Sequence, residues 1–513
     1  MSFQCHIEDL PDQVLGHIFQ YLDRFDIRSA MYVCKRWDLV AFGDGSTKIL
    51  KVFMSEEAYR SYQNAADMPY SLADMVEALS ESRRAYKNLT LVWDSVDIDK
   101  EAIQRILSRF SESIVSVKMH SCGCVTGMQW WAKIVNMFPN LVHLNVNGVF
   151  IDDEAQQYAS RVRLEPMVKL RTLHDRQQLI RFVRHASIAF ANITSLDVRL
   201  TTEAPLTRLF EKLGPKLIHL TLHTPLKVLS VFNDVHFPSL ETLEVISMDA
   251  KIYRVIEDLG GLVNKAPILK NLVLLARIDI FFLQLLDTLQ GTLQKLTIDV
   301  DCVDSGVLQI IGKFKKLKDL WISGMHHIDF QSIENMPKEL SGVRKLVVDC
   351  TDTVPLSEAF YRDCFPNLLD LELQFEDPDD HCLRIVKQLP SLRRLSIHNP
   401  WFEAHLERFL EFCSKLLVQE LHVYCCKLKL GEWDASTSKQ EVPHLRKLSI
   451  SAIEVDSGVY LPMVKSMSAL HELQLALARP CENETVRILL DQFPRCNVVR
   501  LRRSKALFLS TAS

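Results

Sequence analysis

Hydrophobic positions recur along most of the chain in a short unit, Leu-x-x-Leu-x-Leu. Leu240, Leu243 and Val245 show it clearly, and relatives of the unit return roughly every 25 residues. Alternating apolar positions favour a strand, and the stretches between them, such as 102–110, carry apolar residues at helical spacing. Each unit therefore predicts one strand and a return helix, which must stack on its neighbours to bury an apolar face.

Prolines occur at a fixed position in many of these repeats. Alignment on the first leucine position gives seventeen units between Tyr86 and Cys496. A proline cannot continue a helix and favours extended backbone before it, so it suits the entry to a strand. Prolines stand two residues ahead of the first position in eight units, at Pro139, Pro215, Pro238, Pro267, Pro366, Pro390, Pro443 and Pro494.

Residues 1–45 follow a different, helical pattern. Pro11 suits a first helical turn, and Val14, Leu15, Ile18, Phe19 and Leu22 follow at helical spacing. A second amphipathic stretch ends at Gly-Asp-Gly, 43–45. Short helices in so few residues bury little surface, so this head either packs on the repeats as a cap or offers an apolar face to a partner.

The pattern predicts four segments. Residues 1–45 form the helical head, and 46–85 form a helical connector or an irregular first repeat. Residues 86–503 form the repeat body, with a C-terminal tail at 504–513.

The head resembles an F-box domain. The resemblance rests on Leu-Pro, Ile-Phe-x-x-Leu and Val-Cys-x-x-Trp, which occur together within residues 8–45. It implies docking on the adaptor subunit of an SCF-type cullin–RING ubiquitin ligase. The residues that would contact the adaptor or hold the shape of the contact are Leu10, Pro11, Val14, Leu15, Ile18, Leu22, Cys34 and Trp37.

The body resembles leucine-rich-repeat proteins of the longer, helix-backed type. The resemblance implies an α/β solenoid with parallel strands on its concave face and helices outside. Strand side chains alternate, so the third, fifth and seventh positions of each unit should face the concavity. In the early units these positions are basic: Lys118, His120, His143, Lys169, Arg171, Arg199, His219 and His223.

The middle of the predicted concave face carries Trp321, with Val347 and carboxylates nearby. An exposed tryptophan beside an apolar residue has the composition of a binding hot spot, although neighbouring side chains could also cover it. Acids favour a client with Lys or Arg, whereas the basic positions favour an acidic or phosphorylated one, and both stay open. The predicted client-binding residues are Trp321, Val347, Asp319, Asp349, Asp370, Glu372, Lys169 and Arg171.

Composition narrows the class of protein. A net charge of −4 gives no footprint of nucleic-acid binding, and no long apolar run predicts a membrane span. The N-terminus lacks the pattern of a secretory signal, and thirteen scattered cysteines favour reduced thiols. We therefore expect a cytoplasmic or nuclear protein.

Motifs of catalysis are missing from the sequence. It has no phosphate-binding Gly-x-x-x-x-Gly-Lys loop, no His-Glu-x-x-His and no paired Cys-x-x-Cys, so we expect no catalytic residues, metal or cofactor. The predicted function is a non-catalytic substrate receptor, with an adaptor on the head and a client protein in the repeats. The alternatives are a binding scaffold without a ligase role and a small-molecule-sensing F-box receptor, as in the plant hormone receptors that the architecture resembles.

Overall fold

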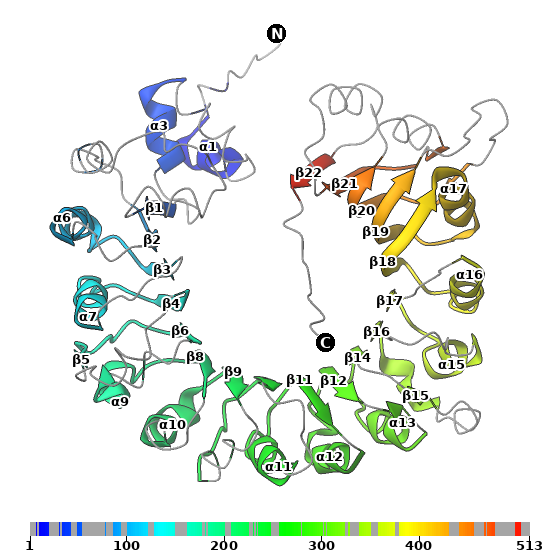
Figure 1. The fold of residues 1–513 in the computed structure, drawn as a ribbon, viewed down its shortest axis with the longest axis horizontal. Coiled ribbons are helices and arrows are strands. Elements are labelled where there is room, and N and C mark those ends of the chain that lie inside the picture. Colours follow the sequence, from blue (N-terminus) through cyan, green and yellow to red (C-terminus); the bar gives the residue numbers. More distant parts are fainter. Residues whose placement is uncertain are drawn as a thin grey trace. The chain divides into compact units, whose positions relative to one another are not determined.

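The computed structural model divides the chain into two units, Met1–Leu240 and Glu241–Ser513, which are described separately (Figure 1). The residues that the structure describes are 7, 10–19, 30, 33–42, 49–53, 77, 79, 86–93, 100–121, 128–148, 162–176, 180, 183–200, 207–224, 229, 232, 234–247, 256–278, 280–300, 302–303, 305–323, 327–328, 338–349, 358–374, 379–429, 441–455, 466–467, 469–477 and 498–503.

The first unit holds the head and the early repeats. The described head helices are α1 (Asp12–Phe19) and α3 (Lys35–Phe42). Seven strands then pair in parallel in chain order: β1 (Ile49–Phe53), β2 (Asn88–Trp93), β3 (Ser116–Ser121), β4 (His143–Gly148), β6 (Thr172–Asp175), β8 (Ser195–Arg199) and β9 (His219–Thr224). The connecting elements are α6 (Lys100–Phe110), α7 (Met128–Asn136), α9 (Ala186–Ala189), α10 (Thr207–Leu213), η3 (Gly214–Lys216) and the short parallel pair β5 (Val162–Arg163) and β7 (Val183–Arg184).

The second unit repeats this arrangement. Its parallel strands are β10 (Thr242–Ser247), β11 (Asn271–Ile278), β12 (Lys295–Val300), β14 (Asp319–Ser323), β16 (Lys345–Asp349), β17 (Asp370–Gln374), β18 (Arg394–His405), β19 (Glu420–Lys429), β20 (Lys447–Val455), β21 (Glu472–Leu477) and β22 (Val498–Arg503). The connecting elements are α11 (Ile256–Asn264), α12 (Ile280–Leu285), η5 (Leu286–Leu289), β13 (Cys302–Val303), α13 (Ser305–Gly312), β15 (His327–Ile328), η6 (Lys338–Gly342), α15 (Glu358–Cys364), α16 (Asp379–Lys387) and α17 (Leu406–Lys415).

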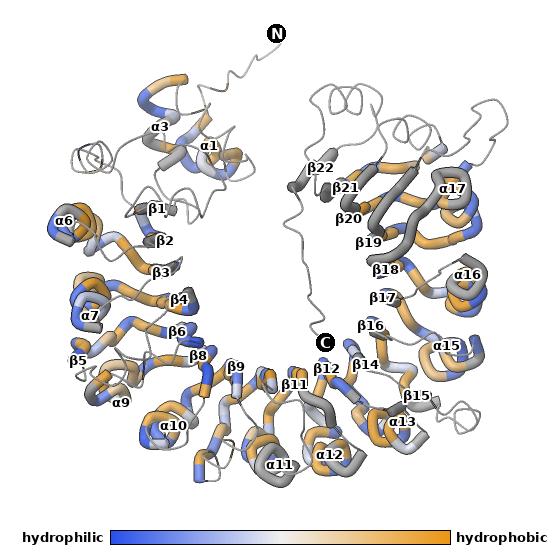
Figure 2. Tube along the Cα trace, viewed as in Figure 1, coloured by the Kyte–Doolittle hydropathy of each residue, from blue (hydrophilic) through white to orange (hydrophobic). Residues whose placement is uncertain are grey.

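The core of each unit lies between the strands and the helices. Leucine positions of neighbouring repeats stand side by side, as Leu196 does with Leu220, and both are buried. On the helix side, α6 buries Ile103, Ile106 and Phe110, which recur at the spacing of one helical face. Figure 2 shows hydrophobic residues recurring in the strands and helices that it colours. We call the opposite, outward face of each sheet its strand face.

The fold is therefore a leucine-rich-repeat-like α/β solenoid preceded by a small helical head, as the sequence predicted. Each of the seventeen predicted repeats contains a strand within the described residues. The sheet begins within 46–85, the segment predicted as a helical connector or an irregular first repeat, because β1 pairs with β2 from Ile49 onward. Part of the connector at 46–85 thus contributes the first strand of the solenoid.

The alignment of the repeats in the sequence places Met167 at the first position of one repeat, and this frame is wrong. Its strand begins at Thr172, and Leu170 and Leu173 are the buried leucine positions. The next core position holds Asp175, which is buried and accepts a hydrogen bond of 2.7 Å from the backbone N–H of Ile180. Because Asp175 occupies a core position that is usually apolar, the hydrophobic pattern of this repeat is hard to recognise in the sequence.

Candidate protein-binding surfaces

The head is a small cluster built on the two described helices. Leu15, Phe19 and Ala30 are buried, and Leu10, Trp37 and Val40 pack against them. The rings of Phe19 and Trp37 lie 5.2 Å apart. Across the helices, Nε of Arg36 donates a 2.8 Å hydrogen bond to Asp12 Oδ1. These contacts fix α1 against α3.

This packing divides the predicted adaptor residues into two groups. Leu10, Leu15 and Trp37 belong to the core of the head and hold its shape. Pro11, Val14, Ile18 and Cys34 are exposed, and Val14 and Ile18 keep 42% and 36% of their surface accessible. Leu22 lies outside the described residues.

Val33 is also exposed, at 57%, although the sequence analysis did not select it as a contact residue. It belongs to the Val-Cys pair of the motif, so a signal was present. Val14 and Ile18 are four residues apart on α1 and therefore lie on one side of that helix. Together with Val33 they give the head a set of solvent-exposed apolar side chains.

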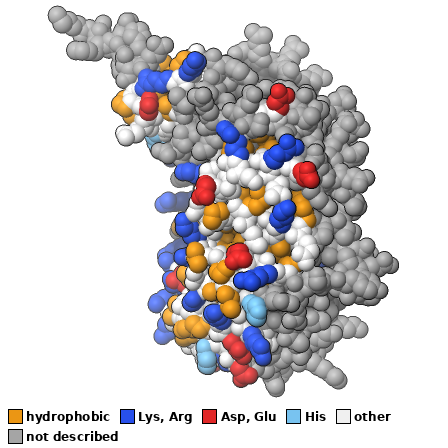
Figure 3. Space-filling model, turned by 90° about the vertical axis from the view of Figure 1, so that its left-hand side faces the viewer, with side chains coloured by type: hydrophobic (Ala, Val, Ile, Leu, Met, Phe, Trp, Pro, Cys, Tyr) orange, Lys and Arg blue, Asp and Glu red, His pale blue; other side chains and the backbone are white. Residues whose placement is uncertain are grey.

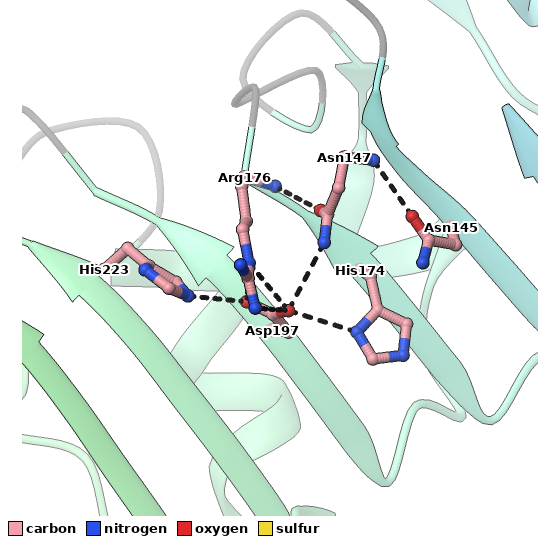
Figure 4. Close-up of polar contacts among 6 residues, drawn as sticks. All are labelled: Asn145, Asn147, His174, Arg176, Asp197 and His223. Carbon is pink, nitrogen blue, oxygen red and sulfur yellow. Dashed lines mark hydrogen bonds and ion pairs between the residues drawn. The ribbon is translucent and has the colours of Figure 1, made fainter. Parts of the chain in front are cut away.

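The strand face of the first unit has Asp197 at the centre of a polar cluster (Figure 4). Asp197 stands on β8, where it is buried to 6% exposure. Arg176 Nε lies 3.1 Å and 3.0 Å from its two oxygens, and His174 Nδ1 donates across 3.1 Å. His223 Nε2 approaches the carboxylate to 3.3 Å from the neighbouring strand β9.

Asn145 and Asn147 complete the cluster, and the backbone N–H of Asn147 donates to Asn145 Oδ1 across 3.1 Å. Asn147 Nδ2 donates to Asp197 across 3.4 Å, and its own Oδ1 accepts a 2.8 Å hydrogen bond from the backbone of Arg176. Burial by itself would raise the pKa of Asp197. The hydrogen bonds from His174, His223 and Arg176, with the charge of Arg176, outweigh burial and hold that pKa far below its usual range. The cluster therefore favours the ionised form of Asp197.

Lys169 and Arg171 do not belong to this strand face, which corrects their predicted role. They lie in the turn before β6, where Lys169 Nζ contacts Asn140 Oδ1 and Arg171 Nη1 donates to the carbonyls of Val168 and Asn192. In Figure 3, Lys and Arg side chains gather along one edge of the side of the molecule that faces the viewer. The misplacement follows from the wrong repeat frame, and His174 and Arg176 occupy the strand-face positions of this repeat instead.

Trp321 lies on the strand face of the second unit, as predicted, and 40% of it is exposed. Val347 was expected to form an apolar surface beside it, but it is only 6% exposed. The register places this short side chain between Trp321 and Glu372, and both of these longer side chains shield it. Of the two predicted apolar contact residues, Trp321 is therefore exposed to a ligand and Val347 is not.

The predicted acids of this face do not form an acidic patch. Asp319 and Asp370 belong to a row of third positions that changes sign at every strand, which we call the charge ladder. Arg394 bridges Asp370 at 3.3 Å and Glu420 at 2.8 Å, and Lys447 approaches Glu472 to 3.5 Å. From β12 to β21 the ladder reads Lys295, Asp319, Lys345, Asp370, Arg394, Glu420, Lys447 and Glu472.

Glu372 is engaged in a contact of its own. His398 Nε2 lies 2.8 Å from Glu372 Oε1, and the ring of His398 stacks on Tyr424 at 3.9 Å. The hydrogen bond from His398 lowers the pKa of Glu372 against the effect of burial. Burial raises the pKa of Asp370, opposed by Lys345 and Arg394. Asp349 ends β16, and its side chain lies outside the described part of the structure.

The described residues were also considered as possible metal ligands. No group of three or more His, Cys, Asp or Glu side chains in this part of the chain could hold a metal ion. Within the same residues, no helix combines the length and apolar character needed to cross a membrane.

Comparison with known proteins finds a family match for the head. Residues 7–46 match the F-box-like family model, so the chain carries an F-box-like domain. No curated protein matches the sequence. Among solved structures, the chain is similar to that of a TLR13–ssRNA13 complex, with 13% identity and a TM-score of 0.36, and the match covers 81% of this chain. It spans 65% of the length of that protein.

Proposed function

We propose that this protein is the substrate-recognition subunit of an SCF-type cullin–RING ubiquitin ligase. The F-box-like head would bind the adaptor, and the repeats would hold a client protein. The observation that carries the proposal is the division of the F-box motif into a buried core and exposed apolar residues. A head that served only to cap the repeats would have no use for Val14, Ile18 and Val33 in solvent.

The chain itself performs no bond chemistry in this proposal. Holding the client near a ubiquitin-charged enzyme raises the effective concentration of client lysines, which is sufficient for a receptor subunit. The adaptor would bury the exposed side of α1, and the strand faces would provide large surfaces for a client.

The test is recovery of the adaptor and cullin with the tagged full-length chain. Val14→Glu/Ile18→Glu places charges on the exposed side of α1 and leaves the buried Leu15 and Phe19 intact. We expect this variant to lose the adaptor while its circular dichroism stays like that of the wild type, because burying unpaired carboxylates at an interface is costly. Substitution of Leu10 is unsuitable, because Leu10 packs in the core of the head.

A matched control is Val168→Glu/Ile188→Glu. These residues are also exposed and apolar, but they lie in the repeats, so this variant should retain the adaptor. Failure of the wild-type chain to recover the adaptor would reject the ligase reading and favour a scaffold. Equal recovery by the head variant and the control would show that this side of α1 is not the contact.

A further inference from the structure

The strand face of the first unit is rich in cations and histidines and poor in carboxylates. Among its described third, fifth and seventh positions, Asp197 is the single acid, and it is buried under Arg176, His174 and His223. The charge of this acid is therefore already balanced. The charged and titratable side chains that face one another across β3, β4, β6, β8 and β9 are Lys118, His120, His143, His174, Arg176, Asp197, Arg199, His219 and His223.

Arg199 shows that this face has hydrogen-bonding capacity to spare. Its Nε atom is buried and has no hydrogen-bond partner among the described residues. A buried donor without an acceptor costs free energy, which an incoming oxygen atom would recover. Lys118, His143 and His219 are exposed on the same face. The surface thus offers donors and positive charge to an anionic ligand.

The cationic groups are spread over a distance that suits a peptide. Lys118 stands on β3 and His219 on β9, four strand spacings apart within the sheet. At about 4.8 Å each, these spacings span about 19 Å, the length of about six residues of extended chain. A single phosphate group could meet only part of this span, whereas a run of carboxylates could follow it.

Nucleic acid fits this face less well. Proteins that hold single strands combine positive charge with aromatic rings on which bases stack. The third, fifth and seventh positions of β2, β3, β4, β6, β8 and β9 include no Phe, Tyr or Trp. The chain as a whole is also slightly acidic, with a net charge of −4.

We propose that the strand face of the first unit binds an extended Asp/Glu-rich segment of a client protein that crosses β3 to β9. Lys118 and Arg199 pair with carboxylates of the segment, and Asp197 holds Arg176 and His174 in place beneath it. The proposal rests on the proposed function, because it names the kind of client that the receptor takes.

The experiment measures fluorescence anisotropy of labelled octaglutamate with the purified full-length chain. Binding should weaken when salt is raised from low to physiological concentration, because exposed charges are screened. Octaglutamine with the same label should not bind.

The decisive variant is Lys118→Gln/Arg199→Gln. Its affinity should fall roughly tenfold, since the loss of each ion pair with the peptide should weaken binding a few-fold. Arg208→Gln/Lys212→Gln removes two exposed cations from α10, on the helix side of the same unit, and should bind like the wild type. Equal weakening by both variants would mean that only net charge matters and would overturn the proposed site.

Two further ligands complete the test. A glutamine octamer with one phosphoserine, or a single-stranded oligonucleotide, that binds more tightly than octaglutamate would overturn the proposal. Recovery of the adaptor tests the ligase function separately from the acidic ligand. If the chain recovers the adaptor but does not bind octaglutamate, the proposed function stands and this inference is wrong. If the chain binds octaglutamate but does not recover the adaptor, the acidic ligand stands and the ligase function is wrong.

Discussion

Asp197→Asn should destabilise the first unit by about 2 kcal/mol at neutral pH. Removing one partner of a buried charge pair costs about 3–5 kcal/mol when the other charge is left in the protein interior. Here the cations left behind are partly solvated, since the side chains of Arg176 and His174 are 47% and 37% exposed. Solvent therefore screens part of the loss. Asparagine also keeps an oxygen that can accept one hydrogen bond.

The pH dependence has a definite sign. The pKa of Asp197 is lower in the folded chain than in the unfolded chain, so its stabilisation is fully present above the unfolded value of about 3.9 and is lost as pH falls below it. Asparagine does not titrate in this range. The difference in unfolding free energy between wild type and Asp197→Asn should therefore shrink between about pH 4 and pH 3.

Urea unfolding followed by circular dichroism measures both effects. Asp234→Asn is the matched control, because Asp234 is an exposed carboxylate in the same unit. The control should unfold like the wild type at each pH. A loss for Asp197→Asn no larger than that of the control, or one that stays constant down to pH 3, would refute the reasoning that the cluster is held together by an ionised carboxylate.

Two other predictions concern packing and thiol reactivity. At Gly214 an added Cβ would lie 2.5 Å from Val235 Cγ1, so Gly214→Ala should cost about 1–3 kcal/mol in urea unfolding, whereas Gly291→Ala, with open space around it, should be close to neutral. Burial raises the pKa of the Cys364 thiol to about 12 and raises that of Cys413 as well. Mass spectrometry after iodoacetamide treatment at pH 8 should find exposed Cys34 alkylated before Cys364 and Cys413, and labelling of either buried thiol ahead of Cys34 would contradict this.

The repeating fold was predictable because its signal is redundant. Leucines and prolines recur at fixed positions of each repeat, so the repeat period remains recognisable even where one repeat matches the pattern poorly. The unit at Met167 shows the limit of this redundancy. Asp175 stands where a leucine would normally complete the pattern, and its place in the core depends on a hydrogen bond from Ile180, which no hydrophobic pattern could reveal.

The sites were less predictable because burial depends on neighbouring strands and helices. Helical spacing placed Val14 and Leu15 on one stripe, but only contact with α3 decides that Leu15 is buried and Val14 exposed. Val347 is covered because of what stands on either side of it in the sheet. The alternation of sign at third positions was visible in the aligned repeats, but the prediction considered the acids alone.

The charge ladder also limits how this protein can change in length. Loss of the repeat that carries Arg394 would bring Asp370 beside Glu420, and like charges on paired strands repel. Loss of two consecutive repeats would instead bring Asp370 beside Lys447 and preserve the alternation. Between β12 and β21, removal of an even number of repeats should therefore destabilise the sheet less than removal of an odd number. The fold repeats with every strand, whereas the charges of this stretch repeat with every second strand.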